Sequence, residues 1–114
     1  MNVVALQGII HRQAERKMLD NGVEAIVYDI RFCSQSGREQ VMVVWYDPPT
    51  TAPVRIGDEV VVIGRARRRY WRSAEKFGFS GEVVAEAVVL RRQRAKVNRL
   101  LDEAQRRIEE GSAV

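Results

Sequence analysis

The first 90 residues consist of short runs rich in β-branched and aromatic residues, and a turn signal separates each run from the next. In Asp20-Asn21-Gly22, for example, Asn and Gly both tolerate the positive φ of a tight turn. Prolines at 48, 49 and 53 exclude a helix interior after the third run. Short strands joined by glycine-containing turns, with one long hairpin, are typical of a small closed barrel. We therefore predict an all-β, five-stranded barrel with strands at 3–10, 24–32, 39–46, 60–72 and 82–90, turns at 34–37 and 56–59, and a hairpin closed by residues 77–81.

The second run alternates apolar and polar residues, which is the pattern of a strand with one buried face. Asp29 and Arg31 fall on the outward face of that strand. The residues expected in the core are Ile26, Tyr28, Ile30 and Phe32.

Residues 91–110 change to helical periodicity, and Gly111 is expected to end the helix. The chain thus divides into a barrel at 1–90 and a C-terminal helical extension at 91–114. Two interpretations of this amphipathic helix stay open: it packs on its own barrel, or it associates with another copy. Its apolar stripe consists of Val97, Leu100, Leu101, Ala104 and Ile108.

The segment most informative about function is 65–72, which holds five arginines and two large aromatic residues directly after the apolar run 60–63. Arginines attract phosphates and aromatic rings stack on bases, so the segment favours a single-stranded nucleic acid as ligand. The alternative is a solvated hairpin arm whose arginines only maintain solubility. On a regular strand, one face carries Arg65, Arg67, Arg69 and Trp71, and the other carries Ala66, Arg68, Tyr70 and Arg72.

Composition and isolated residues narrow the class of protein. The formal net charge is +4, which is mildly basic. Cys33 is the only cysteine, so no intrachain disulfide forms; we expect it to be buried and the protein to be cytoplasmic. The N-terminal sequence lacks the features of a secretion signal, and no apolar run reaches the ~18 residues of a membrane span.

Catalysis is not expected from these residues. His11 is the only histidine, and we expect it at the surface without partners for a metal. No phosphate-binding glycine loop and no G-x-S-x-G nucleophile motif is present. We therefore predict a protein that is not an enzyme and uses neither a cofactor nor a metal.

The order of several short motifs resembles the bacterial single-stranded DNA-binding protein family, whose fold is the oligonucleotide-binding (OB) barrel. The resemblance covers about residues 2–90 and is strongest at 55–65, where Gly57-Asp58 precedes an apolar strand ending in Gly64. The other matching motifs are Asn2 to Gly8, Asn21-Gly22, Val43 to Tyr46, Arg67 to Trp71 and Glu82 to Ala85.

This resemblance implies sequence-independent binding of single-stranded DNA in replication, recombination or repair. It places base-stacking aromatics at Tyr46 and Trp71, whereas Trp45 is one residue out of phase and is expected in the core. Arg65, Arg67, Arg69 and Arg72 would neutralise phosphates. Secondary candidates are Tyr70 and Phe79 for stacking, and Lys17, Arg31 and Lys76 for peripheral contacts.

The resemblance also implies a homo-oligomer, either a dimer or a tetramer. Several family features are missing: two stacking tryptophans, the helix between strands three and four, and an acidic, phenylalanine-ended tip that recruits partner enzymes. The loop after strand one is reduced to Gln13-Ala14-Glu15-Arg16. Two alternative functions therefore stay open: an RNA-binding OB module, and an OB-fold assembly protein that has lost nucleic-acid binding.

Overall fold

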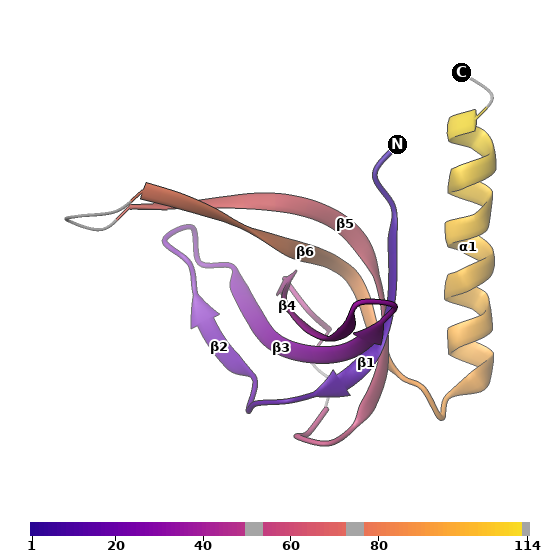
Figure 1. Ribbon diagram of the computed structural model, residues 1–114, viewed down its shortest axis with the longest axis horizontal. Helices are drawn as coiled ribbons and strands as arrows, with labels where there is room; N and C mark the ends of the chain where they lie inside the picture. The colour runs from indigo at the N-terminus through magenta and orange to yellow at the C-terminus, as the bar shows by residue number, and fades with distance from the viewer. Residues whose placement is uncertain (50–53, 73–76, 113–114) are drawn as a thin grey trace.

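The computed structural model describes the backbone of residues 1–49, 54–72 and 77–112, and the side chains of the same residues except 69–72, 77–80 and 112. Figure 1 shows strands that curl around one another, a β5–β6 hairpin that projects to one side, and a helix beside them. In chain order the elements are β1 (Val4–Ile10), β2 (Glu15–Met18), β3 (Glu24–Ser34), β4 (Gly37–Tyr46), β5 (Glu59–Arg72), β6 (Phe77–Leu90) and α1 (Arg94–Ser112).

The predicted five-stranded barrel with a C-terminal helix is confirmed. The strands follow the order β1-β5-β6-β4-β3, and an additional β1–β3 pairing closes the barrel. The β4–β6 pair is parallel, whereas β1–β5, β5–β6, β3–β4 and β1–β3 are antiparallel. This connectivity, in which the first strand bridges two sheet edges, is that of the OB barrel.

The first strand of the barrel changes its pairing partner just after Gly8. Residues 4–9 pair with β5, and Ile9 and Ile10 then pair with β3. A Cβ at Gly8 would lie 2.5 Å from Ile30 Cγ2 and 2.7 Å from the Arg31 carbonyl oxygen, so only glycine permits this approach. The chain then forms β2 along β3, and the loop predicted around Glu15 is therefore wrong in part, because Glu15 begins a strand.

The core lies inside the barrel and consists of apolar residues from every barrel strand. Ile26, Tyr28 and Ile30 are buried as predicted, and Trp45 is in the core with 7% of its surface exposed. Burial raises the pKa of the Tyr28 hydroxyl, despite an opposing effect from the charge of Arg16.

The end of β3 departs from the prediction. Phe32 is only half-buried, and Cys33 is exposed, not buried as expected. The reason is topological: beyond Arg31, β4 is the only described strand that pairs with β3, and the two strands leave the barrel as a hairpin with its turn at residues 35–36.

The long hairpin is formed by β5 and β6. Phe77 to Gly81 were predicted to close it, but they lie in β6, where Gly78 pairs with Trp71 and Gly81 with Arg68. The glycines at 78 and 81 were interpreted as turn residues although they lie within a strand. The connection at 73–76 is outside the described residues.

Helix α1 lies against its own barrel through part of its apolar stripe. Ala104 is buried, Val97 and Leu100 are half-buried, and Leu101 and Ile108 are exposed. The helix does not end at Gly111, because Gly111 lies within the last turn, where a Cβ would be 2.7 Å from Met1 Cε. In the part of the chain that the structure describes, no helix is long and apolar enough to cross a membrane.

Candidate nucleic-acid interface

A groove of about 500 Å³ runs over the outer surface of β3 and β4, below the base of the β5–β6 hairpin. Strand alternation places its floor on this surface, because Ala25 and Val27 alternate with core residues of β3, and Val44 and Tyr46 flank the core residue Trp45. The groove is lined by Lys17, Leu19, Ala25, Val27, Val44, Tyr46, Arg67, Arg68 and Glu82. An apolar floor with an aromatic residue and a cationic rim suits flat, anionic ligands.

Tyr46 is held in the groove by Arg67, which is in turn held by Glu82. Arg67 Nη2 donates a hydrogen bond of 2.7 Å to the Tyr46 hydroxyl, and its Cζ lies 5.4 Å from the ring centroid, within the range of a cation–π contact. Arg67 Nε donates a 2.7 Å hydrogen bond to Glu82 Oε1, and Nη2 also donates to that oxygen. Glu82 is only 3% exposed, so this ion pair lies partly inside the protein.

These hydrogen bonds, first to Tyr46 and then to Glu82, raise the pKa of the Arg67 guanidinium above its ordinary value. The pairing follows from the hairpin register, since Arg67 and Glu82 lie directly opposite one another on β5 and β6. Arg67 was predicted to neutralise phosphate, but its guanidinium already has a carboxylate partner. The geometry favours Arg67 as a residue that positions Tyr46.

The base of the hairpin is fixed by a close backbone approach at Gly64 and by the side chain of Asn2. The β5–β6 register shifts between Ile63 and Gly64, and a Cβ at Gly64 would lie 2.1 Å from the Val84 carbonyl oxygen. The Asn2 side chain continues the β1–β5 pairing: its amide donates to the Ala66 carbonyl and accepts from the Ala66 N–H, both at 2.8 Å. Beyond this point, β6 is the only strand in the described part of the chain that pairs with β5, which makes the rest of the hairpin a two-stranded arm.

Three other cationic residues lie near the groove. Lys17 on β2 lines it, with its Nζ 3.9 Å from a Glu15 carboxylate oxygen. Arg68 is exposed and also lines it. Arg65 is exposed two residues before Arg67 on β5 and makes no ion pair within the described part of the chain.

The remaining arm candidates can be placed by backbone only. Arg69, Tyr70, Trp71 and Arg72 lie in β5, and Phe79 lies opposite Tyr70 on β6. Their side chains, and Lys76 as a whole, are outside the described residues. Their roles stay predictions.

Arg31 does not join the groove. Its Nη2 lies 2.9 Å from His11 Nε2, in a separate groove of about 790 Å³ formed where β1 meets β3. His11 is half-buried there and not fully at the surface as expected. In the described residues, no group of three or more His, Cys, Asp or Glu side chains could hold a metal ion.

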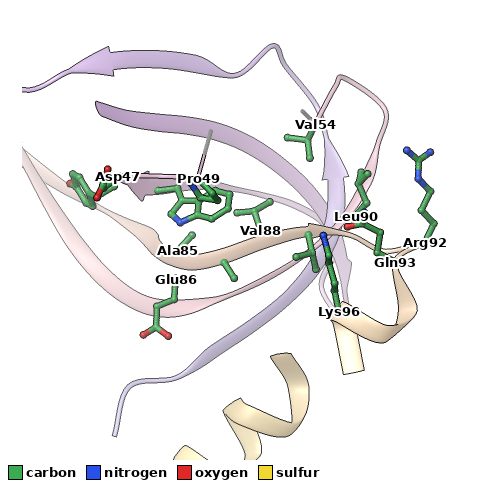
Figure 2. A pocket seen from close by; sticks show the side chains of 14 residues that line it. Asp47, Pro49, Val54, Ala85, Glu86, Val88, Leu90, Arg92, Gln93 and Lys96 are labelled. Atoms are coloured by element: carbon green, nitrogen blue, oxygen red, sulfur yellow. The ribbon is translucent and has the colours of Figure 1, made fainter. Parts of the chain in front are cut away.

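A further groove, of about 720 Å³, borders Tyr46 on the side toward the start of α1. Figure 2 shows Asp47 and Pro49 at one end of this groove and Arg92, Gln93 and Lys96 at the other. Tyr46 therefore lies between two depressions of the surface.

Sequence reasoning missed Glu82 and the apolar floor at Val27 and Val44. Glu82 carried a signal, since it is an acidic residue at the start of the apolar run 83–85. Val27 and Val44 carried none, because an apolar residue on the outward face of a strand is common in any sheet.

The barrel connectivity, with this groove across β3 and β4, defines the OB fold class, whose ligands bind on that surface. No protein-family model matches the chain, and no curated protein sequence matches it. The fold is similar to that of the solved structure of Plasmodium falciparum SSB in complex with ssDNA, with a TM-score of 0.66. The two share 16% sequence identity, and the match covers 79% of this chain and 94% of the Plasmodium chain, so the likeness concerns the fold.

Proposed function

We propose that this chain binds single-stranded DNA, largely independently of sequence, in the groove over β3 and β4 and along the β5–β6 arm. The observation that carries the proposal is the fixed aromatic ring of Tyr46 in a groove rimmed by Lys17, Arg67 and Arg68. The structural likeness to an SSB bound to ssDNA supports the same ligand class.

In this mechanism the rim and the arm act on different parts of the strand. Lys17, Arg65, Arg68, Arg69 and Arg72 neutralise phosphates and release counterions, which makes the affinity fall with salt. Bases stack on Tyr46 in the groove and on Trp71 in the arm, each contributing about 1–3 kcal/mol. Tyr70 and Phe79 offer additional rings, and Arg31 is a more distant contact.

The biological setting that fits such binding is DNA replication, recombination or repair in the cytoplasm, by a homo-oligomer. No protein partner is part of this proposal.

The proposal is tested by titrating the protein with oligo-dT while following tryptophan fluorescence at low and moderate salt. Trp45 is 7% exposed in the core, so quenching on binding reports Trp71. We expect strong quenching that weakens with salt and is lost in Trp71→Phe. Affinities come from the anisotropy of a labelled oligonucleotide, in which Tyr46→Ala and Trp71→Ala each weaken binding about 10-fold or more.

Arg65→Ala should weaken binding, because it removes a phosphate contact. Its matched control is Arg38→Ala, since Arg38 is also exposed but lies at the β3–β4 hairpin tip, outside the groove. Arg38→Ala should leave affinity unchanged. A matched oligo-rU competitor that binds more tightly than oligo-dT would favour the RNA-binding alternative. No binding by either oligonucleotide at low salt would refute the proposal and leave a barrel used for protein assembly.

A further inference from the structure

The apolar stripe of α1 is wider than the part covered by the barrel. Ala104 faces the barrel, but Leu101 and Ile108, on the adjacent side, are 42% and 45% exposed. Arg94, Asn98 and Gln105 continue this exposed stripe at intervals of three and four residues. Figure 1 shows α1 on the outside of the molecule, with its far side open to solvent.

The charges of this helix are arranged against its own dipole. Within α1, residues 94–99 contain three basic residues and no acidic one, whereas residues 100–112 contain four acidic and two basic residues. The first turn has no acidic residue and the last turn has no basic one. Because a helix N-terminus favours negative charge and a C-terminus positive charge, this arrangement is unfavourable for an isolated helix.

We propose that α1 is a dimerisation surface that pairs antiparallel with α1 of a second copy of this chain. An antiparallel neighbour brings its acidic half beside the basic half and opposes the two helix dipoles. The same contact covers Leu101 and Ile108, which the barrel leaves exposed. This inference rests on the homo-oligomer of the proposed function and specifies its contact surface. The nucleic-acid groove is lined by strands and the β2–β3 loop, not by α1, so DNA binding and association can be tested separately.

The spacing of residues specifies where the two helices cross. A crossing near Ala104 places Leu101 beside Ile108 of the second copy, because the two residues are nearly equidistant from that point along the chain. The solvent-facing flank carries Arg99, Asp102, Arg106 and Glu109. In the antiparallel arrangement Asp102 lies beside Arg106 of the second copy, and Arg99 beside Glu109. A parallel arrangement would place like charges at the same height, which is repulsive.

The association is tested by sedimentation velocity over a wide range of protein concentration. We expect a concentration-dependent species of twice the 13.0 kDa monomer mass. Leu101→Glu/Ile108→Glu should remain monomeric with an unchanged circular dichroism spectrum. Ile56→Glu is the control, since it makes the same change at an apolar residue that is 61% exposed but lies outside the helix. A wild type that stays monomeric, or a Leu101→Glu/Ile108→Glu variant that still dimerises, would overturn the proposal.

Orientation is tested by disulfide cross-linking in a Cys33→Ser background. Gln105→Cys lies at the crossing, with the two Cα atoms offset by about 3 Å along the axis, so it should form a dimer on oxidation. Asn98→Cys lies on the same exposed stripe, but the two copies would be about 18 Å apart along the axis and should not cross-link. Equal cross-linking at both positions would indicate a parallel pair and contradict the antiparallel arrangement.

Discussion

Replacing Arg67 with methionine tests whether its ion pair with Glu82, which joins the groove to the barrel, stabilises the fold. Methionine keeps much of the apolar stem but removes the guanidinium, which leaves the Glu82 carboxylate without its partner. The Glu82 side chain is 2% exposed and that of Arg67 is 41% exposed, so the acid is the buried member of the pair. We expect Arg67→Met to destabilise the protein for this reason, and not through loss of packing.

The expected loss of unfolding free energy follows from this burial. Removing one partner of a buried ion pair costs about 3–5 kcal/mol. Water can approach Glu82 from the exposed side of Arg67, so we expect Arg67→Met to lower the free energy of unfolding by about 2–3 kcal/mol. Glu82→Gln keeps an acceptor for Arg67 and should cost about 1 kcal/mol. The double variant Arg67→Met/Glu82→Gln should lose less than the sum of the two single variants, because it no longer buries an unpaired charge.

The assay is urea unfolding followed by far-UV circular dichroism, with the slope against urea checked for constancy. A loss below about 0.5 kcal/mol for Arg67→Met, or strict additivity in the double variant, would show that the Arg67–Glu82 ion pair does not stabilise the fold.

Three further predictions concern the core, the groove and the base of the arm. The Tyr28 hydroxyl is buried and has no hydrogen-bond partner among the residues that the structure describes, so Tyr28→Phe should be neutral or stabilise the fold by up to about 1 kcal/mol in thermal melts. Because burial raises the pKa of Tyr28 in the folded state, the unfolded state loses this proton first as the pH rises. Wild-type stability should therefore fall above about pH 10, and Tyr28→Phe should lack this decline. In salt titrations of oligo-dT affinity, Arg65→Ala should reduce the slope of log K against log salt by about 0.7. Arg67→Met/Glu82→Gln should not change this slope, because the Arg67–Glu82 pair is already neutral. Equal changes in the two variants would contradict the assignment of Arg65, and not Arg67, as a phosphate contact. Asn2→Ala removes both hydrogen bonds to Ala66 and should cost about 1–2 kcal/mol in urea unfolding, whereas no loss would show that water replaces the amide.

The barrel was predictable because most of its strands and turns are each indicated by a pattern of a few consecutive residues. The alternation through Ile26, Tyr28 and Ile30 identifies a strand with one buried face, and Asn21-Gly22 identifies its preceding turn, where Gly22 has a φ of 81°. The four residues of β2 gave no such signal, because all four are exposed and show no alternation. The burial of residues at strand ends was also poorly predicted, because a strand that extends beyond its neighbours no longer has a buried face. Cys33 is the example: it was expected in the core and is exposed.

The groove was predictable only in part. Face alternation placed Arg65 and Arg67 together, and the register opposite β6 agrees with this. The bond between Arg67 and Glu82 depends on how many residues the hairpin connection contains, and the sequence pattern alone placed that connection at 77–81. Arg31 was grouped with the other cations by residue type, but its position near β1 separates it from them.

Binding of DNA in the groove over β3 and β4 is tested residue by residue in an amide ¹H–¹⁵N correlation spectrum of the labelled protein during titration with oligo-dT. We expect the largest shift changes at Lys17, Val27, Val44 and Tyr46 and along the β5–β6 arm, with little change in α1. Changes confined to α1 or to the groove around Arg31, or an unchanged spectrum at saturating oligonucleotide, would contradict binding in this groove.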